Sequence, residues 1–158
     1  MINLSQQISK HLREVYFGGN WTFSNLRDQL ADVSWEQATT QVYDLNTIVA
    51  LTYHVHYYVA AILRVFRGLD INASDKLSFD HPPIQSSEDW ENLVNKIWID
   101  VDALAELVLQ MPEEAWQKTF VDEKYGTYYR NLHGMIEHTH YHLGQIVLIK
   151  KVLRNSKP

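Results

Sequence analysis

Apolar residues recur at helical spacing through most of the chain, and the apolar-polar alternation typical of β-strands is almost absent. The pattern predicts long helical segments at approximately 4–30, 47–67, 86–110 and 130–153. A helix of about 20 residues extends about 30 Å, and four such helices can bury their apolar stripes against one another. We therefore expect an all-α fold, a four-helix bundle, built as a single domain over residues 1–158.

Local signals limit these segments. Adjacent glycines are costly inside a helix, so Gly18 and Gly19 should kink or break the first segment. Asp44 or Asn46 could cap the start of the second segment, and Gly68 should end it.

Two connections between the segments are unusual. Residues 69–87 are long for a helix–helix link, so this connection is either functional or draped over the bundle, and it leaves the topology open. Before the last segment, the β-prone runs 116–121 and 127–129 flank a turn that contains Gly126. This arrangement predicts a small β-hairpin before the last helix.

Composition and charge exclude several classes of function. The chain of 158 residues is long enough to bury a core, and its formal net charge of −5 offers no positive field for nucleic acid. The polar start of the chain and the lack of about 18 uninterrupted apolar residues predict a soluble, cytoplasmic protein that does not bind membranes. The chain has no cysteine, so any thiol in its chemistry must come from outside.

The second segment is apolar on nearly all sides, which is typical of a buried helix. A polar residue in such a helix needs a partner or a purpose. His54 and His56 both lie there.

A second group of histidines lies in the stretch 134–145, with His138, His140 and His142 within five residues. Residues four apart lie on one face of a helix, whereas residues two apart point to nearly opposite sides. His138 and His142 should therefore share a face, directed into the bundle. His140 should lie on another face, either exposed or hydrogen-bonded.

A helical pair of imidazoles one turn apart can ligate a single divalent ion. Two ligands alone would bind weakly, and the third would have to come from another helix, at His54 or His56. Three neutral imidazoles leave a coordination position open, as in a catalytic site. The alternative is that these histidines only satisfy tyrosine hydroxyls and backbone carbonyls inside the protein.

Two familiar metal chemistries do not fit the residues. The zincin pattern needs a glutamate directly after the first histidine, where this chain has Thr139. A di-iron carboxylate bundle needs two Glu-x-x-His motifs, and only Glu137 with His140 forms one.

The stretches 46–54 (NTIVALTYH) and 138–146 (HTHYHLGQI) resemble the second-helix and last-helix signatures of the DinB-like superfamily. The resemblance implies a four-helix bundle, often dimeric, in which a histidine triad binds a divalent metal such as nickel or zinc. Carried over to this chain, the triad is His54, His138 and His142. Some relatives are transferases that use a low-molecular-weight thiol such as bacillithiol or mycothiol.

Together these observations predict a metal-dependent enzyme that acts on a small-molecule substrate, as a thiol S-transferase or with hydrolase-like activity, and that forms a homodimer. The alternative is a non-catalytic metal-binding or dimerising bundle. No residue can be named as a catalytic acid or base. The other histidines should be unrelated to the metal: His133 at the helix start, His11 and His81 at the surface or in a loop, and His56 pointing away from His54.

Overall fold

The computed structural model describes residues 3–155, and within this range the only regular elements are helices. The α-helices are α1 (Leu4–Phe17), α2 (Leu26–Leu30), α3 (Trp35–Thr39), α4 (Ile48–Phe66), α5 (Ser87–Leu109) and α6 (Tyr128–Asn155). Short 3-10 turns lie between them: η1 (Asp75–Leu77), η2 (Glu113–Ala115) and η3 (Glu123–Tyr125). The prediction of an all-α fold is confirmed for the described residues.

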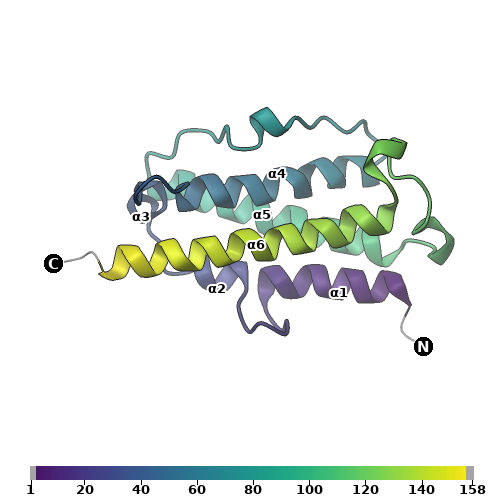
Figure 1. Ribbon diagram of the computed structural model, residues 1–158, viewed down its shortest axis with the longest axis horizontal. Helices are drawn as coiled ribbons and strands as arrows, with labels where there is room; N and C mark the ends of the chain where they lie inside the picture. Colours follow the sequence, from purple (N-terminus) through teal and green to yellow (C-terminus); the bar gives the residue numbers. More distant parts are fainter. Residues whose placement is uncertain (1–2, 156–158) are drawn as a thin grey trace.

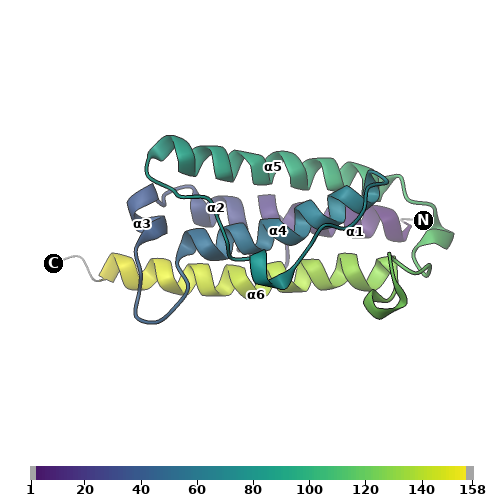
Figure 2. The same ribbon diagram turned by 90° about the horizontal axis from the view of Figure 1, so that it is seen from above.

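The long helices α1, α4, α5 and α6 lie side by side (Figure 1, Figure 2). Helix α5 packs against α1 and α4, and α6 packs against the same two helices. Figure 1 also shows that α4 and α5 run in one direction, whereas α1 and α6 run in the opposite one.

The long connection between α4 and α5 follows from these directions. Because the two helices are parallel, the chain must return along the whole of α4, about 28 Å for its 19 residues, before α5 begins. The connection passes over α4 and forms η1 on the way (Figure 1, Figure 2). It is therefore draped over the helices, as one of the two alternatives predicted.

The first predicted segment is broken where the glycines stand. Helix α1 ends at Phe17, and Gly18 and Gly19 have φ values of 110° and 98°, a region of backbone space that favours glycine. The chain becomes helical again at α2, where the side chain of Asn25 accepts a hydrogen bond from the backbone of Asp28.

Two local predictions were wrong or incomplete. The side chain of Thr47, rather than Asp44 or Asn46, caps α4 by accepting a hydrogen bond from the backbone N–H of Ala50. Helix α3 was not predicted, although Ser34 and Gln37 form the capping box that marks its start. A five-residue helix is too short to show a clear apolar period.

The predicted hairpin is not confirmed. Between 116 and 129 the described residues contain no strand, only an isolated antiparallel bridge between Thr119 and Thr127. The η3 turn occupies the tip, and α6 already begins at Tyr128. Too few residues therefore remain on the second side of the turn to form a strand.

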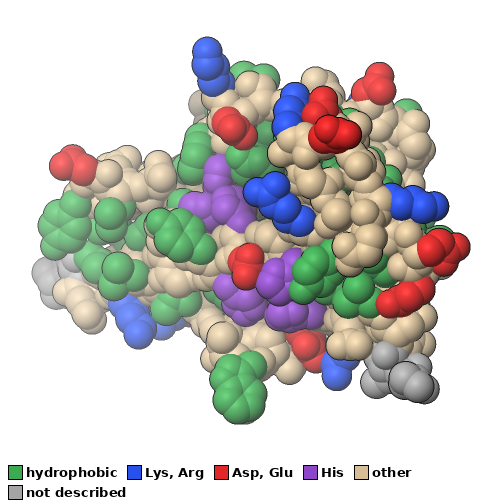
Figure 3. Space-filling view, turned by 45° about the vertical axis from the view of Figure 1, so that its right-hand side comes forward, with side chains coloured by type: hydrophobic (Ala, Val, Ile, Leu, Met, Phe, Trp, Pro, Cys, Tyr) green, Lys and Arg blue, Asp and Glu red, His purple; other side chains and the backbone are tan. Residues whose placement is uncertain are grey.

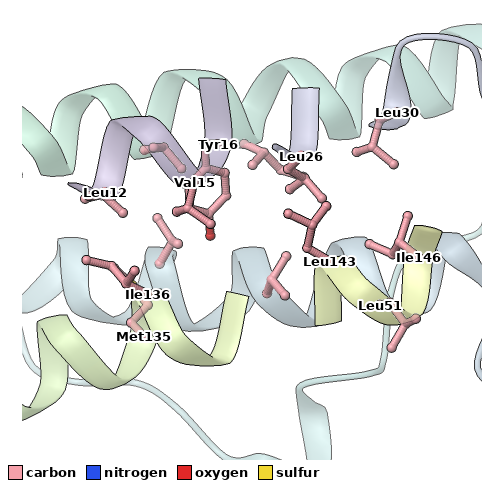
Figure 4. Packing of buried hydrophobic residues seen from close by; sticks show 14 of the residues in the cluster. Leu12, Val15, Tyr16, Leu26, Leu30, Leu51, Met135, Ile136, Leu143 and Ile146 are labelled. Atoms are coloured by element: carbon pink, nitrogen blue, oxygen red, sulfur yellow. The ribbon is translucent and has the colours of Figure 1, made fainter. Parts of the chain in front are cut away.

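Buried apolar side chains from all six α-helices form one continuous cluster. Figure 4 shows Leu12, Val15 and Tyr16 of α1 facing Ile136 and Leu143 of α6. Helix α4 is long and apolar enough to cross a membrane, but 61% of its apolar stretch is buried inside the protein. This burial is that of a core helix.

A buried hydrogen bond joins α1 to the face of α6 that lies against it. The hydroxyl of Tyr16 is 3.1 Å from Oγ1 of Thr139, which itself donates to the backbone carbonyl of Met135. Thr139 already uses its proton, so Tyr16 is the donor. Tyr16 and Thr139 are both fully buried, and a polar group left unpaired in such a place is costly.

Thr139→Val should lower the free energy of unfolding by about 1–3 kcal/mol, because it leaves the Tyr16 hydroxyl buried without an acceptor. Adding Tyr16→Phe removes the unpaired hydroxyl and should restore part of the loss. Urea unfolding of the two single variants and the double variant measures both effects. Strictly additive losses would show that the two side chains do not interact.

Candidate metal centre

Three histidines from two helices meet where α4 packs on α6. His54 lies within α4, and His138 and His142 lie one turn apart in α6. Nε2 of His138 is 3.0 Å from Nε2 of His54 and 3.0 Å from Nε2 of His142. One ring nitrogen from each histidine lies within 4.8 Å of the other two. The structure thus brings together the three residues predicted as metal ligands.

Gln145 sets the orientation of one of these rings. Its side-chain Oε1 lies 2.7 Å from Nδ1 of His142. An amide oxygen only accepts, so Nδ1 carries the proton and Nε2 of the neutral ring keeps its lone pair. That lone pair points toward His138, as required of a metal ligand.

Aromatic side chains enclose the other two rings. Phe79, from the connection over α4, stacks on His54 with ring centroids 3.8 Å apart and planes 9° from parallel. The ring of Tyr58 is nearly perpendicular to the rings of His54 and His138, with centroid distances of 5.2 Å and 5.1 Å. The Tyr58 hydroxyl donates to Asp75 at 3.0 Å, which holds the tyrosine against the connection.

Burial favours the neutral forms of His54 and His138. Burial lowers the pKa of His138 to about 4, and the charges of His142 and His54 act in the same direction. Burial also lowers the pKa of His54, aided by His142, while the backbone of Ser78 opposes the shift. Neutral imidazoles keep a lone pair for a metal ion.

A cleft of about 500 Å³ opens beside His138. It lies between α4, α6, the connection over α4 and the segment that precedes α6. In Figure 3, histidine side chains reach the surface in two groups on one face, among hydrophobic and charged side chains. The cleft is lined by Tyr58, Ala61, Ile62, Ile71, Ala73, Asp75, Phe120, Lys124, Tyr125, Arg130, Asn131, Gly134, Met135 and His138.

His56, the other residue considered as a third ligand, belongs to a different cluster. It is buried, and its Nε2 lies 2.8 Å from Oδ2 of Asp100 on α5. Lys96 contacts the same carboxylate oxygen. Burial alone would raise the pKa of Asp100, but the bonds from His56 and Lys96 outweigh it and lower that pKa. His56 therefore joins α4 to α5 and is not directed at the triad.

The remaining histidines also lie outside the triad. His140 is half-buried beside His11 of α1, with ring centroids 6.0 Å apart. His133 stacks on Tyr129, and His81 lies in the connection over α4.

Several residues around the triad were missed as functional residues. Gln145 has a detectable signal, because it follows His142 by three positions and such residues are neighbours on a helix. Phe79 and Asp75 have none, because only the path of the connection over α4 brings them to the site.

Comparison with protein-family models, with curated proteins and with solved structures finds no match for this chain. The resemblance to the DinB-like superfamily therefore stays a prediction.

The lowered pKa of His138 predicts a pH-dependent stability of the metal-free protein. A histidine in the unfolded chain is protonated below a pKa of about 6.5, whereas His138 in the folded protein is protonated only near its lowered pKa of about 4. The contribution of the neutral His138 ring to the free energy of unfolding is therefore complete above about pH 6.5, and it is lost as the pH falls toward 4. After allowance for solvent around a half-buried ring, the loss should be about 1–2 kcal/mol.

Urea unfolding in a chelator at pH 7 and pH 4.5 tests this prediction when the protein is compared with His138→Gln, which cannot titrate. The wild-type protein should lose more stability than the variant. An equal loss in both would mean that His138 does not contribute to the pH dependence.

Proposed function

We propose that His54, His138 and His142 bind one divalent ion, zinc or nickel, and that the protein is a metal-dependent enzyme that transfers a low-molecular-weight thiol to a small-molecule electrophile. The observation that carries this proposal is the convergence of three imidazole nitrogens at one point beside a cleft. We further propose that the long helices form a four-helix bundle of the DinB-like class, in a cytoplasmic protein.

The residues fit a divalent ion. Each Nε2 atom offers either one proton or one lone pair, so Nε2 of His138 cannot form a separate, fully directed hydrogen bond with both neighbours. His54, His138 and His142 would instead each give one lone pair to a shared divalent ion. Nitrogens that ligate a tetrahedral ion at about 2.0–2.1 Å lie about 3.3 Å apart, close to the 3.0 Å separations seen here.

A divalent ion at this position supplies Lewis acidity, which lowers the pKa of a thiol that binds to it. The residues of the chain prepare the site for such chemistry. Gln145 holds His142 in the required tautomer, and Phe79 covers His54 from solvent. The chain lacks cysteine, so no internal thiolate competes for the ion.

The cleft supports a catalytic rather than a purely structural role for the site. A structural metal site is closed by protein ligands, whereas a catalytic site keeps a position open. His138 lines the cleft itself, so a small molecule could reach an ion bound to it. The non-catalytic alternative provides no reason for this access.

The untagged protein should bind about one zinc or nickel ion per chain. His54→Ala and His142→Ala should each abolish high-affinity binding, and Gln145→Ala should weaken it by about 10–100-fold, as is usual for a group that orients a ligand. Elemental analysis after incubation with each metal, together with calorimetric titration, measures these effects.

His140→Ala is the matched control, because His140 lies in the same helix but contacts His11. This variant should keep its metal. A wild-type protein that takes up neither zinc nor nickel would overturn the proposal.

Catalysis is tested separately from metal binding. In cobalt-substituted protein, an added small thiol should produce a thiolate-to-cobalt absorption band, and this band should be absent in His142→Ala. Metal binding that raises the melting temperature, without any response to thiols, would favour the non-catalytic alternative.

The homodimer remains a prediction from the family resemblance. Sedimentation of the full chain should give twice the chain mass of 18.5 kDa if it is correct. A species of 18.5 kDa at micromolar concentration would contradict it.

A further inference from the structure

The cleft beside His138 carries two cations that no acidic side chain neutralises. Lys124 and Arg130 both line it, and neither takes part in an ion pair among residues 3–155. Five of the eleven other Lys and Arg side chains among residues 3–155 form ion pairs, as in the contact of Arg13 with Glu106. Unpaired cations that face a cleft are available to a ligand.

The charge of the cleft is opposite to that of the whole chain. The chain carries a formal charge of −5. The lining carries Lys124 and Arg130 against the single acid Asp75, which gives two minus one, or +1. Asp75 is already engaged by the Tyr58 hydroxyl at 3.0 Å. An anion that enters the cleft therefore meets a locally positive wall.

Both cations pack against the turn that precedes α6. Gly126 has a φ of 74°, and a Cβ at this position would lie 3.0 Å from Cδ and 3.3 Å from Nη1 of Arg130. The absence of a side chain at Gly126 thus lets the arginine pack closely over the turn. Nζ of Lys124 lies 4.8 Å from the centroid of the Tyr125 ring, a cation–π contact that restrains it.

The rest of the lining is largely apolar. Ile62 of α4, Ile71 of the connection, Phe120 and Met135 contribute to it. A volume of about 500 Å³ is enough for a small molecule with an apolar body. The lining therefore offers both a charged wall and an apolar surface, next to a candidate metal ligand.

We propose that this cleft binds a small amphipathic anion, with a carboxylate or similar head on Lys124 and Arg130 and an apolar body on Ile62, Ile71 and Phe120. The inference rests on the proposed function in one respect: it makes this anion the substrate whose reactive part faces His138. Anion binding itself requires only the cleft.

Calorimetric titration of the full-length, metal-free protein in a chelator tests the proposal with three probes of equal chain length: octanoate, 1-octanol and octylammonium. Octanoate should bind at least about tenfold more tightly than the other two, because only its head is complementary to the cations. The double variant Lys124→Gln/Arg130→Gln should lose this preference. Lys118→Gln, in the same segment but outside the lining, is the matched control and should keep it.

Octanoate that binds no more tightly than octanol, or that shows no saturable binding in the millimolar range, overturns the proposal. So does a double variant that retains the wild-type preference. Circular dichroism confirms that the variants are folded, which is expected because both cations are exposed.

Metal uptake is measured on separate, chelator-free aliquots of the same protein preparations, so the two proposals fail separately. Octanoate selectivity in a wild-type protein that takes up neither zinc nor nickel would remove the proposed enzyme and keep the anion site. Metal uptake without octanoate selectivity would do the reverse.

Discussion

The packing of α4 against α6 is the contact on which the candidate site depends. His54 and the pair His138 and His142 come from different helices, so their nitrogens can meet only if the two helices keep one rotation and one register. The core fixes both. Helix α4 is buried on most of its surface, and α6 is held against α1 by apolar contacts and by the hydrogen bond between Tyr16 and Thr139. Thr139 directly follows His138, so the bond that fixes the rotation of α6 also fixes the direction of the neighbouring histidine, about 100° away around the helix.

The nitrogens of the triad are poorly satisfied by hydrogen bonds within the metal-free fold. Burial disfavours the protonated form of His138, and three nitrogens compete for the hydrogen bonds of one small space. Aliphatic side chains in this space would pack in the core without leaving nitrogens that compete for hydrogen bonds. Local conflict that the surrounding structure tolerates is characteristic of functional sites. By contrast, His56 with Asp100 and Lys96 is a paired, internally satisfied cluster, which fits a role in joining α4 to α5.

The sequence predicted what depends on local periodicity. The long helices, the break at Gly18 and Gly19, and the shared face of His138 and His142 all follow from the repeat of the α-helix. The choice between His54 and His56 did not follow from the residues, because both lie in a helix that is apolar on nearly all sides. It was suggested by the family resemblance, and the structure shows its physical basis: His54 faces α6, and His56 faces Asp100 of α5. The predicted hairpin was not confirmed, because the β-propensity of residues 127–129 does not show that α6 already begins at Tyr128.

The part of the site that could not be predicted comes from the topology. Because α4 and α5 are parallel, the chain must cross the length of α4 between them, and this crossing brings Phe79 onto the ring of His54 and Asp75 to the hydroxyl of Tyr58. The same crossing contributes Ile71 and Asp75 to the cleft, while the turn before α6 contributes Lys124. A shorter connection between antiparallel helices would leave His54 uncovered and the cleft without one wall. The long connection is therefore both a consequence of the helix directions and the element that gives the three histidines an enclosed neighbourhood.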